Sequence, residues 1–236
     1  IFDKLDFVTQ IRFRQICKRL NRIEIHNMYF HVYKKIYLSK LSDKILINYQ
    51  SIKYLDASDN LKITNVNHMT KLQILYAYKD CGIDDNGIKN LNLIKLDTSY
   101  NSRITTVNHM TNLQILYASG YNCGIYDHGI KNLNLTELNA YGNPRITTVN
   151  HMTNLQILDA SGNCGIDNNG IKNLNLIKLY ASDNPKITNI NNMTNLQTLD
   201  ASDNCGINDS CIKNLNLIEL NASWNPKITN INHMTN

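Results

Sequence analysis

The stretch Asn154–Asn163, with the sequence NLQILDASGN, returns almost unchanged 41 residues later as NLQTLDASDN at Asn195–Asn204. Each 41-residue unit divides into two related halves, because an apolar anchor recurs every 20 to 22 residues. The anchors are Ile52, Leu72, Leu93, Leu113, Leu135, Leu155, Leu176, Leu196 and Leu217. A repeat of this length predicts a solenoid in which nine coils stack along one axis.

Within a coil, apolar residues fall at positions 1, 4, 6 and 12, as at Leu176, Leu179, Ala181 and Ile187. The alternation in the first half predicts a short strand. This pattern, which covers about 185 residues, resembles the leucine-rich repeat. The resemblance implies parallel strands that line a concave face, with turns and short helices on the convex side. We therefore expect an α/β repeat fold, with the solenoid at 41–236 and a helical segment at 1–40.

Position 9 carries an amide in most coils, and an amide side chain can donate and accept hydrogen bonds at once. We expect these amides to form a ladder that satisfies backbone groups where the chain leaves each strand. The predicted ladder consists of Asn60, Asn101, Asn143, Asn163, Asn184, Asn204 and Asn225.

Cysteines and histidines also recur at fixed positions, on alternate coils. Members of one such column lie at least about 9.5 Å apart, because parallel strands are about 4.8 Å apart. This spacing is too long for a disulfide and for one shared zinc ion, so we expect reduced thiols and no metal or other cofactor. Reduced thiols favour a cytoplasmic or nuclear protein. The columns are Cys81, Cys123, Cys164 and Cys205, and His68, His109, His151 and His233.

The formal charge of +5 is concentrated at the start of the chain. Residues 1–50 hold 10 lysines and arginines against 4 carboxylates, whereas residues 51–236 hold 14 against 15. A nearly neutral array argues against nucleic acid as the partner, and no apolar run is long enough to span a membrane. The chain begins without Met and stops where a tenth coil would begin, so we expect a piece of a longer protein.

The first residues have a different chemistry. The sequence IFDKLDFVTQI at 1–11, followed by ICKRLN at 16–21, resembles the later two-thirds of an F-box. Leu20 stands where the family commonly has Trp, and the opening Leu-Pro helix of an F-box is missing. The resemblance implies docking onto a Skp-type adaptor through Leu5, Ile11, Phe13, Ile16, Cys17 and Leu20. An F-box before leucine-rich repeats, in so asparagine-rich a chain, resembles the F-box repeat proteins of giant amoeba-infecting viruses, which implies the host cytoplasm.

The strand residues that point away from the core form the predicted recognition surface. Exposed aromatic side chains commonly anchor protein interfaces, although tyrosine is also a frequent strand residue. The candidate partner-binding residues on the concave face are Tyr76, Tyr78, Asp97, Tyr117, Tyr141, Asp159, Tyr180, Asp200 and Trp224.

Three hypotheses about function follow. The first is the substrate receptor of a cullin-RING ubiquitin ligase, which binds the Skp adaptor and a target protein. The second is a binding scaffold without a link to ubiquitin, whose helical head only caps the first coil. The third is a secreted or surface adhesion protein. None of them is an enzyme, since no phosphate loop, metal motif or unique catalytic triad is present.

Overall fold

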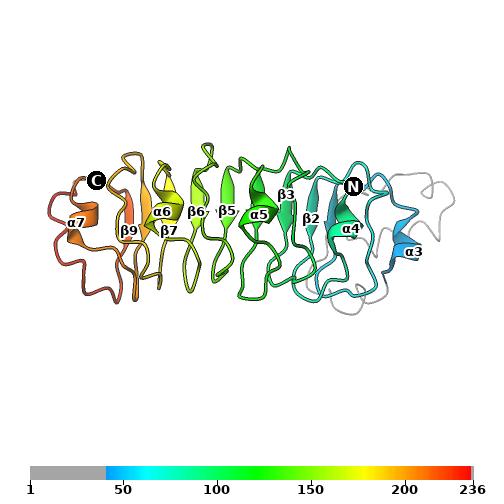
Figure 1. The fold of residues 1–236 in the computed structure, drawn as a ribbon, viewed down its shortest axis with the longest axis horizontal. Coiled ribbons are helices and arrows are strands. Elements are labelled where there is room, and N and C mark those ends of the chain that lie inside the picture. Colours follow the sequence, from blue (N-terminus) through cyan, green and yellow to red (C-terminus); the bar gives the residue numbers. More distant parts are fainter. Residues whose placement is uncertain (1–40, 235–236) are drawn as a thin grey trace, which may run out of the picture.

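The computed structural model describes residues 41–234, which form one elongated solenoid (Figure 1). Its spine is a sheet of nine parallel strands whose order in the sheet is their order in the chain. The strands are β1 (Tyr54–Asp56), β2 (Ile74–Tyr76), β3 (Lys95–Asp97), β4 (Ile115–Tyr117), β5 (Glu137–Asn139), β6 (Ile157–Asp159), β7 (Lys178–Tyr180), β8 (Thr198–Asp200) and β9 (Glu219–Asn221). The predicted parallel solenoid is confirmed.

Short helices recur once for every two strands (Figure 1). They are α3 (Asp43–Leu46), α4 (Asp85–Ile88), α5 (Asp127–Ile130), α6 (Asn168–Ile171) and α7 (Asp209–Ile212). The 41-residue period is therefore an alternation of a helical coil with an irregular coil. Within residues 41–234 no helix has the length and apolar character needed to cross a bilayer. The helical segment predicted at 1–40 lies outside the described residues, and its boundary stays a prediction.

The core is a set of columns that run the length of the array. The middle residue of every strand is a leucine, and in β1–β8 this leucine is at most 1% exposed. The parallel register places these leucines side by side, as in Leu55 opposite Leu75 and Leu158 opposite Leu179. Burial of one leucine side chain contributes about 1.5–3 kcal/mol. Each coil is thus held by the two coils that flank it.

A buried asparagine joins neighbouring coils. Nδ2 of Asn184 donates to the carbonyls of Ala160 (2.7 Å) and Ile166 (3.2 Å) in the preceding coil, while Oδ1 accepts from the N–H of Lys186 (3.0 Å). Asn101, Asn143 and Asn225 make the same three bonds in their own coils. One amide therefore satisfies backbone groups of two coils at once.

The predicted ladder is wrong at Asn163 and Asn204, which are both exposed. In these coils the buried position belongs to the next residue, Cys164 or Cys205. The physical reason is that the asparagine of the following coil already reaches back to the carbonyls of the cysteine-containing coil. A second amide there would have nothing left to satisfy, and a small apolar thiol fills the space.

A carboxylate or amide at the first residue of each helix clamps the following coil. Asp127 accepts from the N–H and the hydroxyl of Thr147 (2.7 and 2.5 Å) and from the N–H of Thr148 (3.2 Å). Asn168 replaces the carboxylate in α6: its Oδ1 accepts from the N–H of Thr188 (2.8 Å), and its Nδ2 donates to the Thr188 hydroxyl (2.7 Å). The clamp therefore works with or without a negative charge.

The third residue of α4, α5 and α6 is a glycine that lies against the preceding coil, and Cys211 takes this position in α7. A Cβ atom on Gly129 would lie 2.1 Å from the carbonyl oxygen of Thr105, and Gly87 and Gly170 have equally close neighbours. Close approach of two backbones, rather than a special φ, therefore explains this glycine column.

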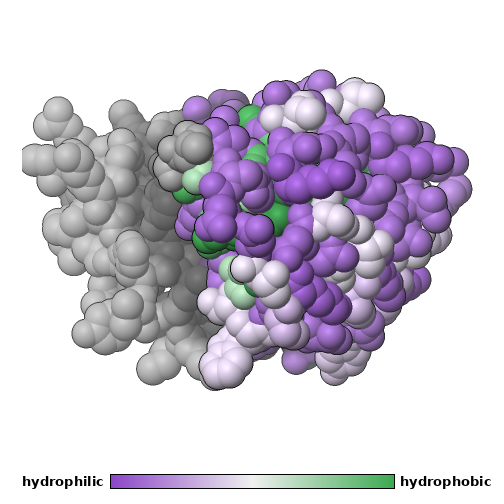
Figure 2. Space-filling model, turned by 90° about the vertical axis from the view of Figure 1, so that its left-hand side faces the viewer, coloured by the Kyte–Doolittle hydropathy of each residue, from purple (hydrophilic) through white to green (hydrophobic). Residues whose placement is uncertain are grey.

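Figure 2 shows the solenoid from the end of its last coil. Hydrophilic side chains make up most of the coloured surface, and a smaller apolar region lies among them. Ile218 and Ile231 of this coil are 68% and 51% exposed. The residues that correspond to Ile231 in earlier coils, such as Ile190, are buried by the next coil, whereas those that correspond to Ile218 stay at least partly exposed.

Asn184→Ala is expected to lower the free energy of unfolding by about 3 kcal/mol, because it leaves two buried carbonyls and one N–H without a partner. Asn163→Ala removes the same amide from an exposed site and should change stability by no more than about 0.5 kcal/mol. Urea denaturation of both variants checks this difference. Equal losses of unfolding free energy in the two variants would contradict the conclusion that the buried amide stabilises two coils at once.

The five cysteines between Cys81 and Cys211 are free and buried in the structure. Burial raises the pKa of the Cys81 thiol to about 12 and that of Cys164 to about 11, so the reactive thiolate is scarce at neutral pH. We expect iodoacetamide at pH 8 to leave these cysteines unmodified in the folded protein and to modify all of them in urea. Peptide mass spectrometry reads out each site, and rapid native alkylation of Cys164 would show that its column is not sealed.

Candidate functional site

The first and third residues of each strand flank the buried leucine and form the outer face of the sheet, here called the strand face. Most of these side chains are half-buried. The parallel register brings the third residues into a row across the sheet. In order from β1 the row is Asp56, Tyr76, Asp97, Tyr117, Asn139, Asp159, Tyr180, Asp200 and Asn221. Six of the predicted partner-binding residues therefore lie together.

The carboxylates of this row have a structural role as well. Oδ1 of Asp159 accepts from the N–H of Ser161 at 3.0 Å, a local turn that ends the strand. Asp97 and Asp200 do the same with Ser99 and Ser202. Asn139 makes the equivalent bond to Tyr141 at 2.9 Å without a charge. The turn needs an acceptor oxygen, and the negative charge is not required for it.

Tyrosines and a lysine make a connected cluster on β2–β5. Nζ of Lys95 donates to the Tyr117 hydroxyl (3.1 Å), which donates to Oε1 of Glu137 (2.9 Å). The same Nζ lies 4.3 Å from the centroid of the Tyr117 ring and 5.8 Å from that of Tyr76. Burial raises the pKa of Tyr117, so its hydroxyl keeps the proton that it donates. The Lys95 cation is thus held by the Tyr117 hydroxyl and two aromatic rings, and the same hydroxyl links it to the Glu137 carboxylate.

A second group of tyrosine and carboxylates lies on β6–β8, where, in the part of the chain that the structure describes, no lysine lies over the tyrosine ring. Tyr180 lies between Asp159 and Asp200 in register. The second oxygens of these carboxylates accept from the amides of Asn139 (3.1 Å) and Asn221 (3.2 Å). Burial, and then the nearby charge of Asp200, raises the pKa of Asp159. Within residues 41–234 no lysine or arginine is ion-paired with either carboxylate.

The other three predicted residues lie after the strands, at the rim of the face. Tyr78 packs edge-on against Tyr100, with ring centroids 5.7 Å apart. Tyr141 is 48% exposed, and Trp224 is 88% exposed in the last coil. These three are therefore separate from the row formed by the third strand residues.

Two residues of the strand face and one backbone feature were not predicted from the sequence. Lys95 and Glu137 occupy first strand positions, where from β2 on an uncharged residue (Ile74, Ile115, Ile157, Thr198) alternates with a charged one (Lys95, Glu137, Lys178, Glu219). The third residue after every strand has a positive φ, in six coils without glycine: Asp59, Lys79, Tyr100, Asp183, Asp203 and Trp224. The glycines at 120, 142 and 162 in this column were the available signal.

The predicted adaptor-binding residues Leu5, Ile11, Phe13, Ile16, Cys17 and Leu20 lie outside the described residues. Their role stays a prediction.

Three of the four histidines in the column have a structural role. Nε2 of His109, His151 and His233 lies 3.0–3.2 Å from the carbonyl oxygen of Ile88, Ile130 and Ile212, respectively, in the preceding coil. A carbonyl only accepts, so Nε2 carries the proton. Across residues 41–234 no group of three or more histidine, cysteine, aspartate or glutamate side chains is arranged to hold a metal ion.

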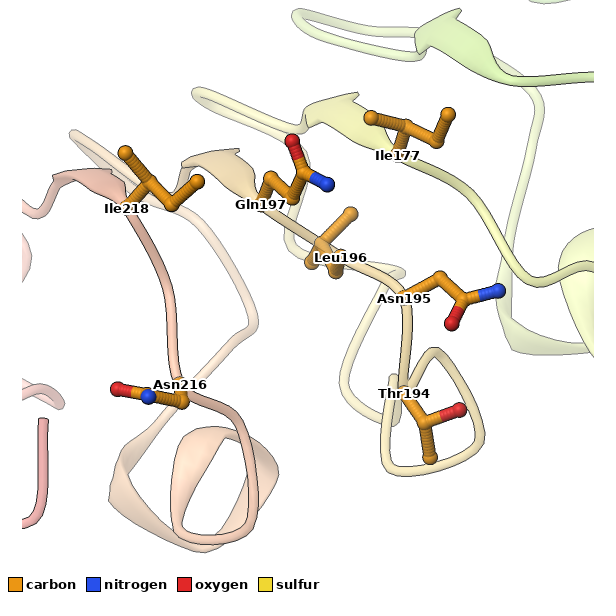
Figure 3. Close-up of a pocket in the computed structure, with 7 residues that line it drawn as sticks. All are labelled: Ile177, Thr194, Asn195, Leu196, Gln197, Asn216 and Ile218. Atoms are coloured by element: carbon orange, nitrogen blue, oxygen red, sulfur yellow. The ribbon is translucent and has the colours of Figure 1, made fainter. Parts of the chain in front are cut away.

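A hollow of about 430 Å³ lies beside the start of β7–β9 (Figure 3). Ile177, Gln197 and Ile218 each precede a strand, with Asn195 and Thr194 in the loop below Gln197. A second hollow, lined by Thr136, Gln156, Ile177 and neighbours, repeats it two coils earlier. Neither is lined by a titratable side chain. Their recurrence marks them as features of the repeat.

No family model matches the sequence, and no curated protein sequence matches it either. Solved structures do match. An internalin, InlF, from Listeria monocytogenes superposes with a TM-score of 0.62 at 21% identity, covering 92% of this chain and 68% of the internalin chain.

Two further structures match at lower TM-scores. The functional domain of InlJ from Listeria monocytogenes, which includes a cysteine ladder, has a TM-score of 0.44 at 22% identity and covers 79% of this chain and 47% of its own. TLR13 in its complex with ssRNA13 has a TM-score of 0.43 at 17% identity, covering 89% and 40%. The likeness to InlF, together with the parallel coils described above, shows that residues 41–234 have the leucine-rich-repeat fold.

Proposed function

We propose that the chain is a protein-interaction module that binds its partner through the strand face. The observation that carries this proposal is the row of tyrosines and carboxylates held in register across nine strands. Eight strand spacings give the row a length of about 38 Å. That length suits a folded protein or an extended peptide better than a metabolite, because small-molecule sites are enclosed pockets.

The finer proposal is a substrate receptor of a Skp/cullin/RING ubiquitin ligase. It is supported by the resemblance of residues 1–21 to an F-box and by a binding face in the same chain. In this role the head docks on the Skp adaptor while the strand face holds the target. The chain contributes positioning, which raises the effective concentration of target lysines near the ubiquitin-loaded enzyme. Free buried cysteines support a cytoplasmic or nuclear setting.

The double variant Tyr76→Asn, Tyr180→Asn tests the strand face. Asparagine occupies the same row position in β5 and β9, so the fold should tolerate it. We expect the amount of partner captured from cells to fall at least about tenfold, because truncating an anchor residue costs about 2 kcal/mol or more of binding free energy. Quantitative affinity capture measures this amount. Tyr121→Asn, which removes a 78% exposed tyrosine outside the row, should retain capture. Equal capture by both variants would rule out the strand face.

Binding to purified Skp adaptor tests the head. The full chain is expected to bind, and Ile16→Asp should abolish binding, because a charge at an apolar contact is strongly unfavourable. Leu158→Ala, a destabilising change inside the array, serves as the control for indirect effects and should leave binding intact. A folded chain that does not bind the adaptor would favour the scaffold without a link to ubiquitin.

A further inference from the structure

Charge is unevenly distributed over the array. The strand face, taken with its rim (the second and third residues after each strand), carries nine carboxylates and three lysines. The carboxylates are Asp56, Asp59, Asp97, Glu137, Asp159, Asp183, Asp200, Asp203 and Glu219, and the lysines are Lys79, Lys95 and Lys178. The other side chains of residues 41–234 include twelve lysines and arginines against seven carboxylates. A nearly neutral array thus presents an acidic recognition face.

Two parts of the strand face have the same third strand residues and differ in their first strand residues. Asp56, Tyr76 and Asp97 lie side by side on β1–β3, and Asp159, Tyr180 and Asp200 lie side by side on β6–β8. In the first group the strand after the tyrosine begins with Lys95, whose Nζ lies over the rings of Tyr76 and Tyr117. In the second group that position is Thr198.

In the first group a lysine of the chain therefore lies over the tyrosine ring, whereas among the described residues no cation lies over the Tyr180 ring. The Tyr180 side chain forms no hydrogen bond, ring contact or cation–π contact with the other described residues, whereas Tyr76 packs against Tyr54 with centroids 5.4 Å apart. Lys178 shares β7 with Tyr180 but is not ion-paired with Asp159 or Asp200 in the structure. An aromatic ring flanked by two carboxylates is suited to an ammonium or guanidinium group.

We propose that the strand face binds a lysine- or arginine-rich segment of the partner protein, and that one basic side chain of this segment lies over Tyr180 between Asp159 and Asp200. The inference rests on the proposed function, because it names the chemistry of the partner for the same face. Charge complementarity is its basis: the partner's cation takes the place that Lys95 takes in the first group.

The test uses the whole chain and two synthetic twelve-residue peptides, one of alternating lysine and serine and one of alternating glutamate and serine. The variant Asp159→Asn, Asp200→Asn removes both charges and keeps the turn acceptor, as Asn139 and Asn221 do. The matched control is Asp127→Asn, Asp209→Asn, which removes two charges from the helix side and keeps the clamp, as Asn168 does. Hydrogen bonds from Thr229 lower the pKa of Asp209, so this control also removes a charge that is present at neutral pH.

We expect the lysine peptide to bind the native chain, and its Kd to rise about 5- to 30-fold in the strand-face variant, since one or two ion pairs of about 1 kcal/mol are lost. The helix-side control should change Kd by less than about twofold. Thr198→Lys places a lysine at the strand position that Lys95 has in the first group. It should weaken peptide binding, because the new ammonium group competes with the peptide's lysine for the place over Tyr180. Circular dichroism shows whether each variant is folded.

Three results would overturn the inference. Preference for the glutamate peptide would reverse the partner's charge while leaving a protein-binding strand face intact. An equal rise of Kd in both double variants would mean that the peptide responds only to the net charge of the chain and not to the strand face. Absence of binding by either peptide would reject the basic partner, and the capture experiment with the tyrosine variants would still decide separately whether the face binds a protein.

Discussion

The buried asparagine that bonds two coils at once is the interaction on which the architecture depends. Its amide satisfies two carbonyls of the coil before it and one N–H of its own coil. An unsatisfied buried backbone group costs about 1–3 kcal/mol, so every second coil requires this residue. The structural unit is consequently a pair of coils, and the 41-residue period of the sequence follows from it.

The cysteine, the short helix and the glycine recur with the same pairing of coils. The coil whose carbonyls are satisfied from the next coil is free to place a small cysteine in the core. The same coil forms the short helix whose first residue, such as Asp127, clamps the threonine of the next coil. In α4, α5 and α6 a glycine then lets the helix lie against the coil before it. Because nearly every inward or loop position serves the stack, the outward strand positions are where the repeats differ in charge and aromatic character.

The sequence was sufficient to predict the strands, their parallel order and the row of tyrosines and aspartates, because a fixed repeat places equivalent residues in register. It was insufficient at Asn163 and Asn204. Those residues share a sequence column with Asn184, and only the three-dimensional path shows that one amide serves both coils. The contribution of Lys95 was also hidden, because its importance depends on contacts with rings on two neighbouring strands. The strand register is also what shows that Lys95 and Thr198 occupy equivalent positions beside Tyr76 and Tyr180.

The strand face as the partner-binding surface is the central claim, and carboxyl footprinting of the chain with and without its captured partner tests it most directly. Carbodiimide labelling followed by peptide mass spectrometry reports the accessibility of individual carboxylates on both sides of the array. The account predicts that Asp159, Asp200 and Glu219 lose reactivity when the partner is bound, while Asp127 and Asp209 keep theirs. Protection of Asp127 and Asp209 with unchanged labelling of Asp159 and Asp200 would contradict it.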